Sequence, residues 1–341
     1  MADIIFSESS AVNDVFFGKY DVPIRAMIMD YAEPLKDERI INTLFAPVKS
    51  THFAEAYGSS TAMDDWLPVG ENGFGGTNGF QAGPTKVIPN LEWKSDFSIS
   101  KTIIEDTNMQ ELKGRPQKFV TSYYRTRENF AAALYGGALS GKKVIDINAG
   151  AAGIQRIDIT GADGEPLFSV NHKSYTGKGK AQSNMYEDEV SNDAIMAMET
   201  EMQNRRDEDG NLLDIRPDTI VIPNDYQLKK KVFAAIGADK DPDTAYNGFN
   251  YNFGRWNVLV WNRICQYVAD SSKPWMMIDA NFIQEYFGAV FQDRTDLEID
   301  VFKEKNDALT YHGRSRFGGG FTNFRFASVG GAAGGTTLIG G

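Results

Sequence analysis

Hydrophobic side chains recur at helical spacing within residues 101–141. Four of them fall four, seven and four residues apart, on one face of an α-helix: Phe119, Tyr123, Phe130 and Leu134. Pro116 suits a first helical position, and the glycines from Gly136 onward favour a helix end. The pattern therefore predicts one amphipathic helix over 116–140, roughly 37 Å long at 1.5 Å per residue.

Shorter apolar runs, several of them alternating, predict strands over much of the remaining chain. They occupy 91–99, 144–147, 154–159, 219–222, 256–260, 275–278, 297–301 and 310–326. Two further helical patterns cover 187–206 and 225–236, the second closed by Gly237. Helices together with short antiparallel strands indicate an α+β fold.

Three segments lack a pattern that would fold by itself. Residues 1–65 show no persistent periodicity and are expected to form an extended arm lying against something else, such as a neighbouring subunit. Within this arm, residues 34–45 suit a short helix that starts at Pro34. Residues 66–100 carry a glycine-rich centre and predict a long β-hairpin-like loop, for which a phosphate-cradling loop is the less favoured alternative. The tail 330–341 is expected to be flexible unless it is pinned.

Composition narrows the function class. The 341 residues are 42% hydrophobic and carry a net charge of −11, with a pI of about 4.9, which disfavours a uniformly basic nucleic-acid-binding face. No signal peptide or membrane span is indicated, so we expect a cytoplasmic protein with no membrane partner. The one cysteine, Cys265, excludes an intramolecular disulfide and is expected to be a small core residue.

The motifs that suggest chemistry are incomplete. Residues 136–143 satisfy GxxxxGK but end in Lys143 where a nucleotide loop needs Ser or Thr. Aspartates at 239, 241 and 243 have calcium-loop spacing without the required glycine, which leaves adventitious cation binding as the alternative. The three histidines, at 52, 172 and 312, lie far apart and outside known catalytic contexts. We therefore assign no catalytic residue, no metal site and no cofactor, and predict that the chain is not an enzyme.

Five ordered segments resemble parts of a known family. They are MDDWLP (63–68), LEWKSDFSISKTIIEDTNM (91–109), PLFSVNH (166–172), DGNLLDIRPDTIVIP (209–223) and KPWMMIDA (273–280). In this order they resemble segments of Mu-type phage major head subunits, and the order of elements resembles tailed-phage major capsid proteins of the Hong Kong 97 type. The resemblance runs through most of residues 60–328.

The resemblance implies a domain plan of six parts. They are an N-terminal arm (1–65), an extended loop or E-loop (66–100), the first part of a peripheral domain with its spine helix (101–170), an axial domain (171–280), the returning peripheral strands (281–329) and a flexible C-terminal tail (330–341). In this plan the loop at 239–253 is the candidate for an axial tip.

The same resemblance implies that subunit contacts complete the arm and the loops. Candidate interface residues are Phe16, Phe17, Trp66, Phe74, Phe80, Trp93, Tyr246, Phe249 and Tyr251. Basic residues that are candidates for contacts with DNA or for intersubunit ion pairs are Lys173, Lys178, Lys180, Arg314 and Arg316. On an acidic chain, ordinary solvation of these basic residues is the alternative.

The implied function is that of a major capsid protein. It would self-assemble into hexamers and pentamers of an icosahedral head, built in the host bacterial cytoplasm, that encloses double-stranded DNA without reading its sequence. Implied partners are a separate scaffolding protein, a portal and a decoration protein. Two alternatives stay open: an encapsulin-like cargo compartment, and a soluble α/β ligand-binding protein or enzyme using the aromatic region 246–261.

Overall fold

The chain is described here by a computed structural model. It describes residues 24, 26–36, 38–61, 66, 68–69, 71, 73–74, 81–105, 109–150, 153–237, 249–268 and 273–338. Two compact units are present. The first comprises Met1–Arg39, Asn90–Phe130 and Asp293–Gly318, and the second Ile40–Pro89, Ala131–Gln292 and Gly319–Gly341.

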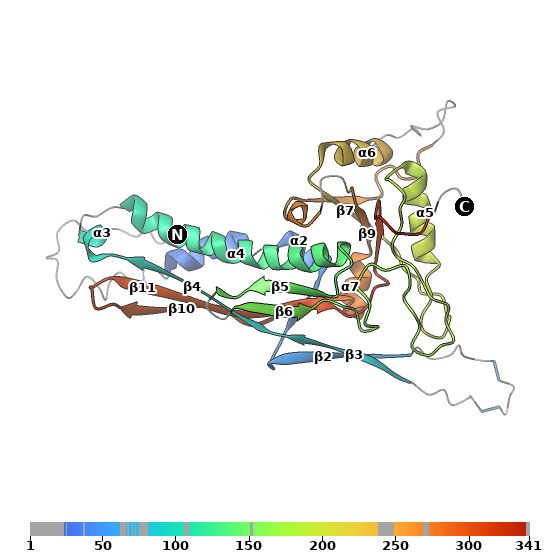
Figure 1. Cartoon of the computed structure of the whole chain (residues 1–341), viewed down its shortest axis with the longest axis horizontal. Coiled ribbons are helices and arrows are strands. Elements are labelled where there is room, and N and C mark those ends of the chain that lie inside the picture. The colour runs from blue at the N-terminus through green and yellow to red at the C-terminus, as the bar shows by residue number, and fades with distance from the viewer. Residues whose placement is uncertain are drawn as a thin grey trace. The chain divides into compact units, whose positions relative to one another are not determined.

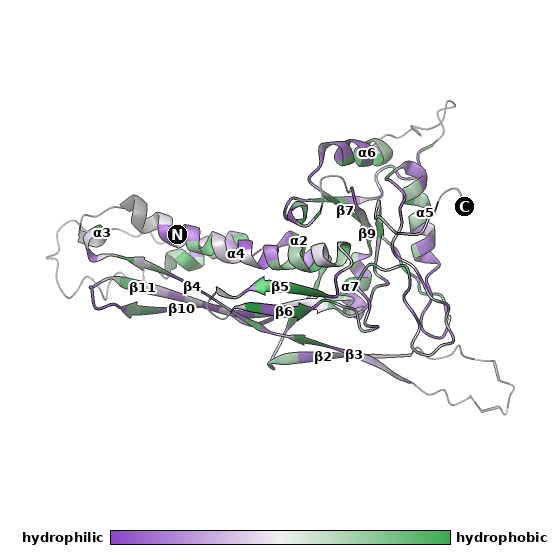
Figure 2. Ribbon diagram, viewed as in Figure 1, coloured by the Kyte–Doolittle hydropathy of each residue, from purple (hydrophilic) through white to green (hydrophobic). Residues whose placement is uncertain are grey.

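The long helix α4 (Met109–Leu139) is the predicted amphipathic helix, and its apolar face is confirmed. Phe119, Phe130 and Leu134 are buried, and Figure 2 shows hydrophobic and hydrophilic residues mixed along α4, as on an amphipathic helix. The predicted start is wrong, because α4 begins seven residues before Pro116 and continues through it. A proline inside a helix removes one backbone hydrogen bond, which the packing of the face beyond it outweighs here.

A four-stranded sheet packs against α4 in the first unit. It has the order β1-β10-β11-β4 and contains β1 (Ala46–Lys49), β10 (Ala289–Lys303), β11 (Leu309–Phe321) and β4 (Leu91–Ile99), the last three labelled in Figure 1. β1 and the parts of β10 and β11 at 289–292 and 319–321 belong to the second unit. β4 and β11 are antiparallel, with Leu309 opposite Ile99 and Phe317 opposite Leu91. Burial alternates along β11, so that one face meets the core and the other carries His312, Arg314 and Arg316.

The core of the first unit joins segments that lie far apart in the sequence. Residues 26–32 are helical, and their buried side chains meet those of the sheet and α4. Members of this cluster are Ile24, Ile28, Ala32, Ile99, Phe119, Val120, Ile299, Leu309 and Tyr311. The expected extended arm therefore differs from the structure at residues 26–32, which are helical. The short helix expected within 34–45 is present as η1 (Glu33–Leu35) and α2 (Arg39–Leu44).

The second unit is built on a sheet of order β12-β9-β7-β8. Its strands are β12 (Ala327–Gly330), β9 (Trp275–Ile278), β7 (Thr219–Pro223) and β8 (Asn257–Trp261). Every residue of β7 and β9 is buried, as their continuous apolar runs predict. The accompanying helices are α5 (Asn192–Gln203), α6 (Tyr226–Gly237), η3 (Arg263–Gln266) and α7 (Ala280–Tyr286).

Helix starts in the second unit follow their capping residues. The predicted helix 187–206 is shorter in the structure, because Ser191 accepts a hydrogen bond from the Ala194 amide and sets the start of α5. Asp279 caps α7 in the same way through the Phe282 amide. The helix predicted over 225–236 is confirmed as α6.

Two hairpins complete the second unit, and one of them corrects the expected loop. β2 (Ala54–Ser60) pairs with β3 (Ala82–Pro89), so the arms of the hairpin are 54–60 and 82–89, while β4 leaves to join β11. The expectation that 66–100 is itself the hairpin is therefore wrong, because its partner strand lies earlier in the chain. The strands predicted at 144–147 and 154–159 are confirmed as the pair β5 (Val144–Asn148) and β6 (Ile154–Asp158).

The C-terminal segment and the cysteine also differ from expectation. The segment expected to be flexible unless pinned is pinned within the chain: Glu187 and Leu338 donate backbone hydrogen bonds to Thr336 and to the Asp188 carboxylate. Cys265 is exposed, so its expected place in the core is wrong. Cys265 lies on the short helix η3, and its sulfur accepts a 3.2 Å hydrogen bond from the backbone amide of Asn224.

Candidate assembly surfaces

The connection between β2 and β3 displays large hydrophobic side chains. Trp66 is 92% exposed and Phe74 96% exposed, whereas Phe80 lies outside the described residues. The base of this connection is held firmly, because the Ser59 hydroxyl donates to the Pro84 carbonyl and a Cβ on Gly83 would lie 2.7 Å from the Tyr175 ring. A fixed base carrying exposed aromatic rings is the arrangement expected of an association surface.

A second set of exposed aromatic residues lies in the described part of the predicted axial-tip loop, residues 249–253. Phe249 is 79% exposed and Tyr251 51% exposed; residues 238–248, including Tyr246 and the three aspartates, lie outside the described residues. The buried amide of Asn250 donates to the Ala235 carbonyl at 2.6 Å and ties this segment to the end of α6. The Arg255 guanidinium lies 4.1 Å from the Tyr251 ring centre, which holds that ring in place.

Arg255 also carries an internal ion pair. Its guanidinium lies 2.6 Å from the carboxylate of Glu199, which is buried on α5. Hydrogen bonding to this carboxylate raises the pKa of Arg255. The aromatic segment is therefore fixed to two helices, α5 and α6.

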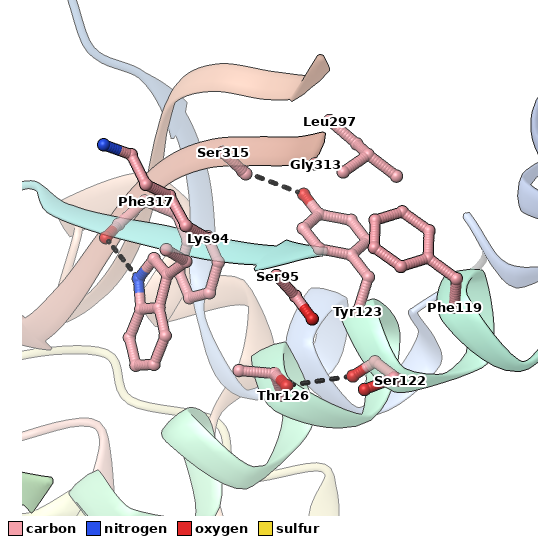
Figure 3. A pocket seen from close by; sticks show the side chains of 11 residues that line it. Lys94, Ser95, Phe119, Ser122, Tyr123, Thr126, Leu297, Gly313, Ser315 and Phe317 are labelled. Atoms are coloured by element: carbon pink, nitrogen blue, oxygen red, sulfur yellow. Dashed lines mark hydrogen bonds between the residues drawn. The ribbon is translucent and has the colours of Figure 1, made fainter. Parts of the chain in front are cut away.

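Trp93 is half-buried and packs against residues of its own subunit. Its ring stacks on Phe317 at 4.8 Å and meets Phe130 edge-on at 5.6 Å, and its indole N–H donates to the Phe317 carbonyl. It lines a cavity of about 70 Å³ between α4 and the strands β4 and β11, where Tyr123 meets Ser315 (Figure 3). The structure thus gives Trp93 a packing role inside one subunit.

A larger cavity of about 590 Å³ lies in the second unit, beside β2 and α7. Exposed rings of Tyr286 and Phe287 form part of its wall, and Phe287 has a left-handed φ of 52°. Arg325 donates to one carboxylate oxygen of Glu208 at 2.7 Å, while the second oxygen is buried without a partner. No pattern in the sequence indicates this cavity, because its lining residues come from five separate segments.

The candidate ionic residues do not form one patch. Lys178 pairs with Asp209 at 3.0 Å, and Lys173 and Lys180 are exposed on the same loop. On β11, Arg314 lies 2.7 Å from Glu92 and 3.3 Å from Glu298, and hydrogen bonds from Arg314 lower the pKa of Glu92. Arg316 follows on the same strand face. The acids around Arg314 favour an ion-paired protein surface over a phosphate site.

Groups that would support chemistry are sparse in the described part of the chain. There, no three His, Cys, Asp or Glu side chains come together as a metal site would require. His172 is buried, stacks on Phe324 and bonds to Asp163 at 2.6 Å, which fits a structural residue. None of the described helices is long and apolar enough to cross a membrane.

Among the exposed aromatic residues that the sequence analysis did not select, two lie on one helix. Tyr226 is 77% exposed and Phe233 50% exposed, both on α6. From the sequence alone, these aromatic residues cannot be told apart from the apolar residues Leu228, Val232 and Ile236 of the same helix. The structure shows that the aliphatic side chains are buried and the two rings are exposed. Phe16 and Phe17 lie outside the described residues.

Comparisons with known proteins match this architecture. No curated protein matches the chain. Among solved structures, the capsid of Ralstonia phage GP4 aligns with a TM-score of 0.50 at 13% identity, covering 82% of this chain and 83% of that one. A structure from Mycobacterium phage Patience gives 0.49 at 10% identity (93% and 88% covered), and the procapsid of bacteriophage JBD30 gives 0.47 at 12% (93% and 75%).

At such identities the likeness to phage GP4 supports the fold, which is the α+β capsid fold expected above. The decisive match is to a family model. The model described as phage capsid protein covers residues 85–329, from β3 to β12. This is well over half of the chain, which therefore belongs to the phage capsid protein family.

Proposed function

We propose that this capsid protein assembles through heterologous contacts into hexamers and pentamers of an icosahedral head that encloses double-stranded DNA. The observation that carries the proposal is the β2–β3 connection, where Trp66 and Phe74 stand almost fully exposed on a fixed base. Isolated soluble subunits rarely display such rings, and burial in a neighbouring copy removes them from water. The role is structural and involves no catalysis.

Within this proposal the parts of the chain have distinct tasks. The β2–β3 connection acts as the E-loop, α4 as the spine of a peripheral domain, and residues 171–280 as an axial domain whose loops gather at ring centres. Phe249 and Tyr251 contribute to that gathering, and Trp93 stays inside the subunit. We further propose a Mu-type relationship, assembly in the host cytoplasm, and a separate scaffolding protein, a portal and a decoration protein as partners.

Net charge fits the proposed cargo. At −11 the subunit repels a polyanion on average, which limits adhesion of packaged DNA to the shell. The basic residues Lys173 and Lys180 remain proposed sites of local contact with DNA or with a neighbouring subunit. Sequence-specific DNA binding is not part of the proposal.

The test combines a loop deletion with a side-chain change. Deleting residues 70–80 leaves β2 and β3 intact, and a Trp66→Ser, Phe74→Ser double variant keeps the loop length. We expect both proteins to unfold at the wild-type temperature but to form few closed shells in sedimentation and negative-stain microscopy. Normal shells from both variants would refute the loop's role, and a wild-type chain that stays monomeric with its scaffold would refute the assembly function.

A further inference from the structure

The outward face of α6 combines aromatic rings with a lysine. Tyr226 and Phe233 are 77% and 50% exposed, and the exposed Lys230 lies between them, four residues after the first and three before the second. This spacing places all three on one helical face. The opposite face is buried through Leu228, Val232, Ala235 and Ile236. We call the outward face the α6 stripe.

The outward face of α5 has the opposite charge. Asp193 and Glu201 are exposed, and the 37%-exposed Met196 lies between them, all on one side of the helix. We call this face the α5 stripe. The remaining acid of the helix, Glu199, is buried and already paired with Arg255. Its buried face is formed by Ala194, Ile195, Met198 and Met202.

The two helices are each of a single charge sign. α6 contains three lysines and no acid, whereas α5 contains three acids and no basic residue. Lys231 is engaged within the chain by Glu189, as Glu199 is by Arg255. Lys229 is half-buried and donates to the side chain of Asn224. The exposed charges without such a partner are therefore Lys230 on one helix and Asp193 and Glu201 on the other.

The stripes also agree in length and in chemistry. Seven residues separate Tyr226 from Phe233, or roughly 10.5 Å of helix, and eight separate Asp193 from Glu201, or roughly 12 Å. A thioether packs favourably against aromatic rings, so Met196 suits the two rings of α6. A contact between two different faces of identical subunits is heterologous, the type that closes rings.

We propose that the α6 stripe of one copy packs on the α5 stripe of the next copy in the ring, with Lys230 facing Glu201 and the rings of Tyr226 and Phe233 covering Met196. This inference rests on the proposed assembly function and names one contact within it. A nucleic acid is the other occupant that lysines suggest. Two exposed aromatic rings beside one lysine, and an acidic counterpart on the same chain, favour a second copy.

Charge exchange tests the contact. Lys230→Glu and Glu201→Lys are made singly and together, and each purified chain is followed by sedimentation velocity and negative-stain microscopy, with its scaffold where wild type needs one. Because like charges facing across an interface cost more than an exposed ion pair contributes, each single variant should need at least about tenfold more protein to form rings. The double variant should assemble like wild type.

Mixing the two single variants distinguishes a contact between copies from one within a copy. In a ring where they alternate, every contact has either the original or the exchanged pair of charges. Alternation is possible around six subunits but not around five, so the equimolar mixture should form hexamers and few pentamers or closed shells. The double variant, in contrast, should form both.

Lys231→Glu is the matched control, since it makes the same charge change beside Lys230 on a lysine already paired with Glu189. It should assemble within about twofold of wild type, because an exposed pair contributes little. Normal assembly of the single variants would overturn the contact. So would folded single variants whose loss of assembly is repaired neither by combining the two changes in one chain nor by mixing the two variants. A wild type that never assembles would refute the proposed function itself.

Discussion

Two regions of this phage capsid protein treat their charged groups differently: the surroundings of Arg127 and Arg314 in the first unit, and the outward faces of α5 and α6 in the second. In the first unit, the buried Arg127 is held by Glu38 at 2.8 Å and Asp293 at 2.5 Å, and even the surface residue Arg314 has two acidic neighbours. In the second unit, by contrast, the α5 and α6 stripes leave charges of opposite sign facing outward. Figure 1 shows these two helices as separate elements of that unit.

This difference separates stability from association. A charged group whose partner lies in the same copy affects the free energy of unfolding of the subunit. The effect of losing one partner is small at the surface and large in the interior. A charge whose partner lies in another copy leaves folding unchanged and affects only assembly. Variants in the first unit should therefore change the unfolding of the subunit, whereas variants on the stripes should change its oligomeric state.

The largest expected effect comes from Arg127. Replacing it with methionine leaves the half-buried carboxylates of Glu38 and Asp293 without a counter-charge and removes a cation–π contact with Phe317 at 5.0 Å. Because breaking a buried ion pair from one side exposes the full desolvation cost, Arg127→Met should lower the free energy of unfolding by about 3–5 kcal/mol. Denaturant unfolding of the unassembled subunit measures this.

Arg125 provides the matched control for Arg127. It lies two residues earlier on α4, is exposed, and Arg125→Met should change the free energy of unfolding by no more than about 0.5 kcal/mol. If the two variants unfold alike, the stability of the first unit does not depend on the ion pairs of Arg127. The contrast between the two regions then fails.

Packing between α4 and the sheet offers a second, smaller test. A Cβ added at Gly313 on β11 would lie 2.2 Å from the ring of Phe119, so the ring must move. Gly313→Ala should therefore cost about 1–3 kcal/mol of unfolding free energy. A Cβ added at Gly114 on α4 would meet no atom within 4 Å, so Gly114→Ala should instead stabilise the subunit by about 0.5–1 kcal/mol.

A thermal unfolding series on the two alanine variants and wild type decides the matter. Both variants should retain the wild-type capacity for assembly at temperatures where they are folded. Equal stability of the Gly313 and Gly114 variants would show that the space beside Phe119 is looser than the structure indicates.

The sequence predicted the elements whose periodicity is local. The buried face of α4, the strands β7 and β9 and the helix α6 follow from the spacing of apolar residues alone. The start of α4 was missed because Pro116 reads as a first helical position, although packing carries the helix through it. The β2–β3 pairing was missed because its two strands are separated by a long connection that contains no turn signal close to β2.

The assembly surfaces were harder to predict, for a related reason. Trp66 and Phe74 could be selected from sequence because they stand in a glycine-rich stretch without periodicity. Tyr226 and Phe233 could not, since an aromatic residue in an amphipathic helix gives no sign of facing outward until the buried face is known. The partners of Arg127 lie 89 and 166 residues away, beyond any local pattern.

The smallest expected effect concerns Arg314, a surface arginine of the first unit whose acidic partners lie in the same copy. Hydrogen bonds from Arg314 lower the pKa of Glu92 below its unfolded value. A lowered carboxyl pKa contributes stability above the unfolded pKa, and this contribution is lost as the pH falls through the folded pKa. Arg314→Gln should thus reduce the free energy of unfolding only slightly near pH 7, because the pair is exposed to solvent.

The pH dependence distinguishes this pair from simple loss of packing. The difference between wild type and Arg314→Gln should shrink as the pH falls from the ordinary glutamate pKa, about 4.3, through the lower folded pKa of Glu92, and it should also shrink at high salt. A difference that persists unchanged at a pH below that folded pKa would mean that the arginine stem, rather than its charge, supports the sheet. Lys230→Glu, in contrast, should leave the unfolding curve unaltered at every pH. The two variants together therefore test whether the partner of a charged group lies in the same copy or in the next copy.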